Sequence, residues 1–154
     1  MRTRKLVHSH QGFSLIELLI VCALLAILLA LTLPNLISSK RAAREQTAKG
    51  KLAGIGAQET SFKTLLGKRR YGALSELQAA TAGGSPLLTA ADTSVPEWTF
   101  SDVGAATTTT FGVKVEPASG NPASYSFAIF EDQVVRRCAL GGPWSKSDCT
   151  QVNE

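Results

Sequence analysis

The sequence predicts an α+β protein in which one long N-terminal α-helix packs on a small antiparallel β-sheet. Three observations support this fold class. An apolar run opens the chain from Phe13 to Leu33. Apolar residues then recur with a helical period of about 3.6 as far as Leu66. After residue 110 the period changes to two, which is typical of β-strands.

The run from Phe13 to Leu33 is long enough to cross a bilayer as a helix, since a span needs about 20 residues. Glu17 is its only charged residue. A cleaved secretory signal has an apolar core of about 7–15 residues that ends in small residues before the cut. Neither feature fits this run, so a retained membrane anchor is the better interpretation.

Pro34 lacks a backbone N–H and is expected to kink the helix rather than end it. An amphipathic helix is predicted beyond it, as far as about Leu66, with Gly67 as its stop. The alternative is two helices with a break near Pro34 or Gly50. Glycines at positions 50, 54 and 56 weaken the helix and suggest close packing against a neighbour. The residues on its apolar face are Leu52, Ile55, Phe62 and Leu66.

Strand signals follow in the C-terminal half. A short helix or turn is predicted at Ser75–Ala80, and residues 81–98, punctuated by Gly and Pro, are predicted to be an irregular connection. Residues 110–116 and 125–130 read as a hairpin, residues 133–138 as a third strand, and residues 98–103 as a fourth at the edge. One face of this sheet is apolar, so the inner face of the long helix can cover it. The apolar positions are Phe111, Val113, Val115, Tyr125, Phe127 and Ile129.

The formal net charge of +4 is concentrated at the N-terminal tip. Arg2, Arg4 and Lys5 precede the apolar run, whereas beyond Gly12 thirteen basic residues face twelve acidic ones. A nucleic-acid-binding domain carries its excess charge on a folded face, so nucleic acid is not expected as a partner. The basic run Lys68–Arg70 is expected to be a solvated loop.

Cys138 and Cys149 lie close together near the C-terminus, in a stretch with glycine and proline. In an oxidising compartment this pair predicts a disulfide, whereas in the cytosol it would be two reduced thiols. Basic residues flank the apolar run on both sides, so the positive-inside rule does not orient it. The disulfide interpretation places the N-terminus in the cytoplasm and the bulk of the chain outside. Cys22, within the apolar run, is expected to be a packing residue.

The residues Gly12–Glu17, reading GFSLIE after a short basic leader, resemble the processing site of type IV prepilins and the related pseudopilins. The resemblance implies cleavage between Gly12 and Phe13 by prepilin peptidase on the cytoplasmic face, and N-methylation of Phe13. Glu17 is then the fifth residue of the mature chain, where this family keeps its acid. Pro34 stands where type IV pilins commonly carry a helix-kinking proline, while Ala26 stands where the family often has glycine.

The resemblance implies four segments along the chain. Residues 1–12 are the leader peptide, and residues 13–33 are the transmembrane and filament-core helix. Residues 34–67 are the amphipathic helix, and residues 68–154 hold the αβ-loop, the antiparallel sheet and the C-terminal disulfide loop.

Glu17 has a physical role in this interpretation. Cleavage creates a cationic amine on Phe13, and in a filament that amine can meet the Glu17 carboxylate of a neighbouring subunit. At about 4 Å and an effective dielectric of 20 the attraction is roughly 4 kcal/mol before desolvation. The desolvation cost of a buried ion pair often cancels its attraction. The pair is therefore expected to fix the register between subunits rather than to add net stability. The alternative is a tolerated acid at the membrane interface.

The implied function is that of a structural subunit of a type IV pilus, processed after Gly12 and polymerised through its N-terminal helix. A pseudopilin of a type II secretion system is the alternative, and a tethered binding domain that never polymerises is a third hypothesis. The C-terminal disulfide loop is common in type IV pilins, whereas major pseudopilins more often use a calcium site. Expected partners are further copies of the chain in a helical homopolymer, prepilin peptidase and the pilus or secretion assembly machinery. The chain is expected in the bacterial inner membrane before assembly, then in an extracellular or periplasmic filament.

Enzyme chemistry is not expected. Both histidines, His8 and His10, lie in the leader, so the mature chain implied by the resemblance has none. This excludes a Ser-His-Asp triad, a Cys–His pair and a His-ligated zinc site. No phosphate-binding or calcium-binding motif is present, and neither cofactor nor metal is expected. The remaining possible ligands are scattered carboxylates: Asp92, Glu97 and Asp102.

Overall fold

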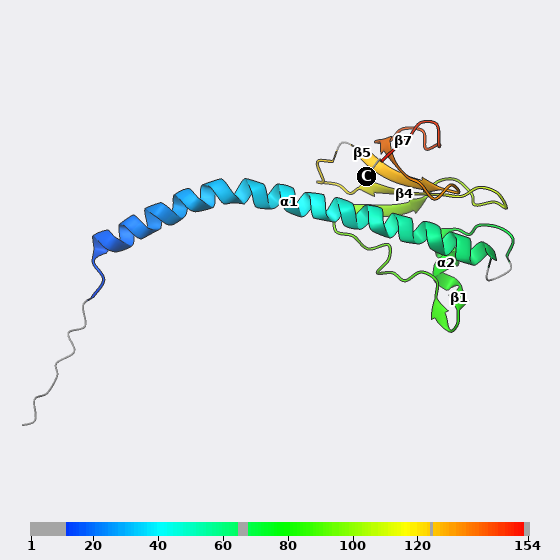
Figure 1. The fold of residues 1–154 in the computed structure, drawn as a ribbon, viewed down its shortest axis with the longest axis horizontal. Coiled ribbons are helices and arrows are strands. Elements are labelled where there is room, and N and C mark those ends of the chain that lie inside the picture. Colours follow the sequence, from blue (N-terminus) through cyan, green and yellow to red (C-terminus); the bar gives the residue numbers. More distant parts are fainter. Residues whose placement is uncertain (1–11, 65–67, 124, 153–154) are drawn as a thin grey trace, which may run out of the picture. The chain divides into compact units, whose positions relative to one another are not determined.

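One long helix and a five-stranded antiparallel sheet make up most of the structure (Figure 1), which confirms the predicted α+β class. The structure is a computed structural model that describes residues 12–64, 68–123 and 125–152. The chain divides into two compact units after Arg41. We call the second unit, from Ala42 onwards, the head.

Helix α1 runs from Leu15 to Thr64. It continues through Pro34 and Gly50, so the alternative of two separate helices is wrong. A proline removes one hydrogen bond of a helix and its ring clashes with the preceding turn, yet a helix can continue beyond such a site with a kink. The predicted end of the helix at Leu66 and Gly67 lies outside the described residues.

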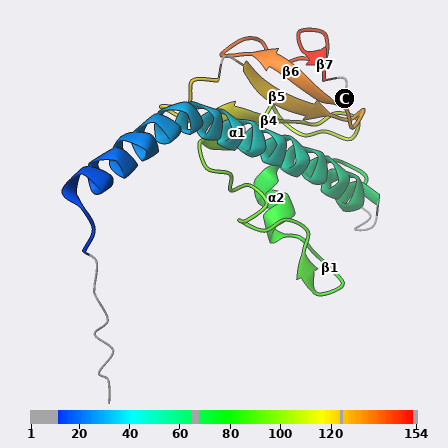
Figure 2. The same cartoon turned by 60° about the vertical axis from the view of Figure 1, so that its left-hand side comes forward.

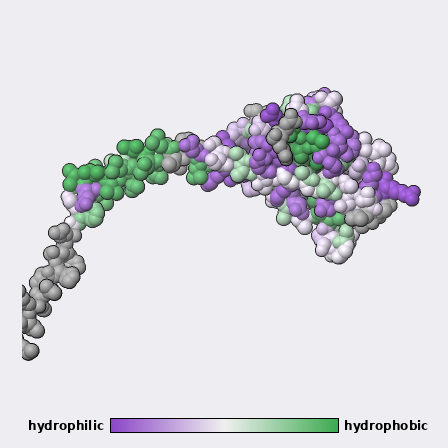
Figure 3. All heavy atoms as spheres, in the orientation of Figure 1, coloured by the Kyte–Doolittle hydropathy of each residue, from purple (hydrophilic) through white to green (hydrophobic). Residues whose placement is uncertain are grey.

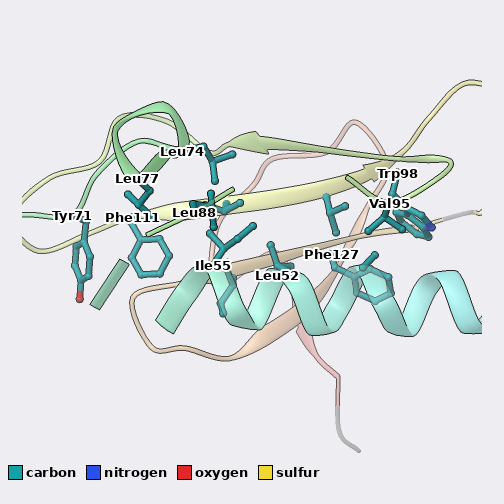
Figure 4. Packing of buried hydrophobic residues seen from close by; sticks show 14 of the residues in the cluster. Leu52, Ile55, Tyr71, Leu74, Leu77, Leu88, Val95, Trp98, Phe111 and Phe127 are labelled. Carbon is teal, nitrogen blue, oxygen red and sulfur yellow. The ribbon is translucent and has the colours of Figure 1, made fainter. Parts of the chain in front are cut away.

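In the head, α1 turns an apolar face towards the sheet and towards α2 (Leu74–Ala79). Leu52 and Ile55 are fully buried, and Phe62 is nearly so, as the helical period predicts. Figure 4 shows Leu52 and Ile55 of this helix facing side chains from the strands and from α2. The other large residues of this core include Leu74, Leu77, Leu88, Trp98, Phe111, Val113, Val115, Phe127 and Ile129.

The sheet is an antiparallel meander in the order β3-β4-β5-β6-β7. Four of these strands match the predicted ones, and β3 lies at the edge as expected. β7 forms the opposite edge and is not predicted, because a pair of residues carries no periodic signal. The strands are β3 (Trp98–Asp102), β4 (Gly112–Pro117), β5 (Tyr125–Phe130), β6 (Val135–Ala139) and β7 (Thr150–Gln151).

Both faces of the sheet are covered, so the expectation of a single apolar face is incomplete. Strand β5 is buried on either side: Phe127 and Ile129 face the α1 core, while Ala128 and Phe130 belong to a second cluster. That second cluster also contains the two half-cystines of the C-terminal loop, with Val103 and Trp144 packed against it. The C-terminal loop packs over the part of this face around Ala128 and Phe130, which the alternation within the strands cannot reveal.

The segment that follows α2 is more ordered than predicted. Strands β1 (Thr81–Ala82) and β2 (Ser85–Pro86) form a small antiparallel hairpin. Gly83 and Gly84 connect them with φ angles of 60° and 85°. Positive φ at both central positions is what a tight hairpin turn requires, and glycine accepts it without steric cost. Figure 2 shows this hairpin extending from the end of α2.

Candidate functional site

The N-terminal end of α1 holds the residues that the sequence singles out. Gly12 and Phe13 precede the helix and are exposed, and α1 begins at Leu15. The Ser14 carbonyl accepts a hydrogen bond from the Leu18 N–H at 3.2 Å. Gly12, Phe13 and Ser14 have no regular secondary structure. Cleavage between Gly12 and Phe13 stays a prediction.

Glu17 lies in the first turn of α1. The N–H groups of a first turn have no partners within the helix and carry partial positive charge, so a carboxylate is stabilised there. This local effect gives Glu17 a favourable position in the single chain, without any partner subunit. The pairing of Glu17 with the amine of a neighbouring copy remains a prediction.

An exposed apolar surface covers the N-terminal half of α1 (Figure 3). The exposed fractions of its large apolar side chains between Phe13 and Leu31 range from 42% at Val21 to 86% at Leu15. By length and composition α1 is suited to cross a membrane. So much apolar surface in water is unfavourable by roughly 25 cal/mol per Å². This part of the helix therefore requires a lipid or protein environment.

Two further residues of the apolar helix have defined places. Cys22 is a free cysteine and is exposed in the single chain, so its role as a packing residue in the membrane or in a filament stays a prediction. Pro34 lies within α1, as predicted for a proline that bends a helix rather than ends it. Lys40 and Arg41 follow on the same helix and are exposed.

Within the head, charged side chains of α1 contact the strands and loops that flank the helix. Glu45 accepts a hydrogen bond from the Tyr125 hydroxyl at 2.9 Å and pairs with Lys49 at 2.9 Å. Arg44 pairs with Glu97, and Lys51 donates to two carbonyls of the loop before β3. The outward face of α1 in the head is consequently made of small and uncharged residues. Its exposed residues are Ala42, Ala43, Gln46, Thr47, Gly50, Ala53, Gly54, Ala57, Thr60 and Thr64.

The glycines of α1 separate into two kinds. A Cβ at Gly56 would lie 2.6 Å from Ile129 Cδ1, so the absence of a side chain there allows the helix to approach β5 closely. Cβ atoms at Gly50 and Gly54 would have no described atom within 4 Å. The expectation of close packing therefore holds within the chain only for Gly56.

Cys138 and Cys149 form a disulfide, with their Cα atoms 4.5 Å apart. Both residues are almost fully buried in the second cluster. The bridge holds the C-terminal loop against the sheet and positions β7 beside β6.

The scattered carboxylates that could have bound a metal serve structural purposes. Asp92 accepts hydrogen bonds from the Thr89 N–H and hydroxyl, and Asp102 accepts from the Leu74 N–H. Among the described residues no group of three or more His, Cys, Asp or Glu side chains could hold a metal ion. Glu97 forms an ion pair with Arg44.

The residues of the basic run Lys68–Arg70 have different environments. Arg70 pairs with Glu76, with Nη1 and Oε2 2.8 Å apart, and its guanidinium lies over the Phe62 ring. This pair lowers the pKa of Glu76 to about 2. Lys68 and Arg69 are exposed, as expected for a solvated loop.

Glu59 is a buried carboxyl that is not among the residues predicted from the sequence. It has no exposed surface, and burial raises its pKa to about 7, although a hydrogen bond from the Gly72 N–H opposes that rise. A signal was available: Glu59 stands four residues after Ile55 and three before Phe62, on the apolar face of the helix.

Comparison with known families identifies the N-terminal region. Residues 7–33 match the prokaryotic N-terminal methylation motif, so the chain carries the signal of proteins that are cleaved and methylated at a new N-terminus. That motif supports a type IV pilin-like or pseudopilin precursor, which points to a structural subunit. No curated protein and no solved structure matches the chain. The apolar N-terminal helix fits the membrane anchor of such a precursor.

Proposed function

We propose that the chain is a structural subunit of a type IV pilus. Prepilin peptidase cuts after Gly12 and methylates the amine of Phe13, and the mature chain polymerises through the apolar half of α1. Prepilin peptidase, the inner membrane, the pilus assembly machinery and further copies of the chain are the partners in this proposal.

The observation that carries the proposal is the exposed apolar half of α1 combined with the methylation motif that overlaps it. A membrane shields this surface before assembly. In a filament, copies of the same helix shield one another, and burial of apolar area drives the association. Glu17 then favours the stagger at which its carboxylate meets a neighbour's Phe13 amine, since every other stagger leaves a charge unpaired in an apolar environment.

The disulfide supports the pilus over a pseudopilus. The Cys138–Cys149 bridge closes a C-terminal loop, the feature that resembles type IV pilins. It also fits a head that matures outside the cytoplasm, where disulfides persist. The N-terminus is then cytoplasmic and the head lies outside, so α1 crosses the membrane once.

The test is to express the full chain with prepilin peptidase in its host, shear the cells, and examine the released material by electron microscopy and mass spectrometry. We expect surface fibres whose subunit begins at an N-methylated Phe13. Fibres that form only in the periplasm together with a type II secretion system would identify a pseudopilin. A dispersed protein that begins at Met1 would refute polymerisation altogether.

A further inference from the structure

Glu59 lies at a junction where three carboxylates receive three consecutive backbone N–H groups. The Gly72 N–H donates to Glu59 Oε2 at 2.9 Å, and the Ala73 N–H donates to Glu76 Oε2 at 3.0 Å. The Leu74 N–H donates to Asp102 Oδ1 at 3.1 Å. Glu59 on α1 and Asp102 on β3 therefore tie the start of α2 to two other elements, while Glu76 binds it from within α2.

Only one of these carboxylates is fully buried. Glu59 has no exposed surface, and its second oxygen, Oε1, is buried without a hydrogen-bond partner among the described residues. The desolvation free energy of an ionised carboxylate in that position is not offset by hydrogen bonds, whereas the neutral acid has a much smaller desolvation cost. The site therefore favours the protonated form of Glu59.

The charged groups around Glu59 add to this preference. Asp102 on β3 and Glu76 on α2 repel its ionised form, and burial is the largest cause that raises its pKa. Arg70 attracts the ionised form weakly, because its guanidinium is already paired with Glu76. On α1 itself, the Lys63 ammonium lies 4.2 Å from the centre of the Tyr71 ring.

We propose that Glu59 is a proton-controlled latch that holds the segment Arg70–Leu74 against α1. With Glu59 protonated, the segment is closed on the helix through the Gly72 N–H and the packing of Gly72 against Phe62 and Leu77. Ionisation of Glu59 favours an open state in which the carboxylate reaches water. The latch acts within one chain and does not depend on polymerisation.

The latch alters the surface at this end of the head. A groove bounded by Phe62, Lys68, Arg70 and Glu76 lies along the same segment, with Ala79 and Ala80 as its apolar wall. Release of Arg70–Leu74 from α1 reshapes this groove. The groups that the head presents here consequently depend on pH in the neutral range.

The direction of the pH dependence follows from proton linkage. In the open state Glu59 titrates near its ordinary pKa of 4.5, and in the closed state near 7. The closed state therefore binds more protons between these values, so opening becomes about tenfold more favourable per pH unit from pH 4.5 to about 7. Above that range both states are ionised and the dependence levels off.

The test is amide hydrogen exchange at Gly72 in the full chain in detergent micelles, measured from pH 5 to pH 9. Each variant is compared with the wild type at the same pH, so that the intrinsic exchange chemistry cancels. We expect Glu59→Gln to remove the extra opening at neutral pH, because glutamine keeps the acceptor for the Gly72 N–H and cannot ionise. The control Glu116→Gln, which removes a carboxylate paired with Lys114 on β4, should follow the wild type.

A second measurement needs no variant at Glu59. The ¹³C shift of the Glu59 carboxyl in the wild-type chain should titrate near pH 7, and Asp102→Asn should lower that midpoint by removing a neighbouring negative charge. A Glu59 titration near pH 4.5, or an unchanged pH dependence in Glu59→Gln, would overturn the latch.

Discussion

The Tyr125 hydroxyl donates a hydrogen bond to Glu45 Oε2 at 2.9 Å, which joins β5 to α1 across 80 positions of the sequence. Lys49 pairs with the same carboxylate and lies 4.9 Å from the centre of the Phe127 ring. Together these contacts align the start of the head helix with the middle strand of the sheet. The alignment depends on side chains that no local pattern relates to one another.

Replacing Tyr125 by phenylalanine should destabilise the head by about 1–2 kcal/mol, because the ring stays and only the hydrogen bond to a charged group is lost. The hydrogen bond to Glu45 raises the pKa of Tyr125. Its contribution is therefore complete below about pH 10 and is lost as the pH rises through the higher pKa of the folded state. Thermal unfolding at pH 7 and at strongly alkaline pH measures both effects.

Tyr71→Phe is the matched control for that experiment. Tyr71 is also an aromatic residue of the core, buried with 9% of its surface exposed, but among the described residues its hydroxyl makes no hydrogen bond that could be lost. We expect little change in stability at either pH. Equal losses from the two variants would show that the Glu45 contact contributes nothing.

Reduction of the Cys138–Cys149 bridge should cost about 2–3 kcal/mol, since it frees a loop of 11 residues in the unfolded chain. It should also release β7 and expose the second cluster. A Cys22→Ser variant should respond to reductant like the wild type, because Cys22 is not in the bridge. A Cys138→Ser, Cys149→Ser variant should be insensitive to reductant. Near-ultraviolet circular dichroism during thermal unfolding provides the measurement.

Two glycine-to-alanine substitutions in α1 should have opposite effects although they lie two residues apart. Gly54→Ala should stabilise the head by up to about 1 kcal/mol, because alanine is the better helix former and the position is open. Gly56→Ala should destabilise it by about 1–2 kcal/mol, because the new methyl group meets Gln133 Oε1 and Ile129 Cδ1, and Ile129 is fully buried. Chemical denaturation measures the free energy of unfolding of both variants. Changes of the same sign in the two variants would contradict the packing of α1 on β5.

Glu17→Ala should still be processed and should still enter the membrane, yet its filament yield should fall by about tenfold or more. In the proposed filament the variant loses the carboxylate that pairs with a neighbour's Phe13 amine, while the apolar surface remains. Leu18→Ala is the control, because it removes neighbouring apolar area and keeps the charge. The measurement is the amount of subunit in the sheared fraction. A normal yield from Glu17→Ala would contradict the pairing of the Glu17 carboxylate with the Phe13 amine of a neighbouring subunit.

Gly12→Glu should block processing, so that the chain accumulates with its leader. A Cβ at Gly12 has no described atom within 4 Å, so the fold accepts a side chain there and the block would act at the peptidase. Mass spectrometry of the membrane fraction should find the unprocessed form. Mature protein at the wild-type level would be inconsistent with a cut after Gly12.

Sequence alone determined the features that arise from local pattern. The apolar run with Glu17 inside it, the helical period of Leu52, Ile55 and Phe62, and the alternation in β4 and β5 each depend on neighbours within a few residues. The motif at the N-terminus is likewise contiguous. These features were sufficient for the fold class and for the class of precursor.

Tertiary structure decided what depends on contacts between distant residues. The burial of Glu59, the second cluster behind β5 and the pairing of β7 with β6 each require segments far apart in the chain to meet. A carboxyl group on a helix titrates normally or near neutral pH according to what covers it, and that cover comes from the Gly72 segment and β3. Periodicity describes which face of an element is apolar, whereas packing decides which polar group that face encloses.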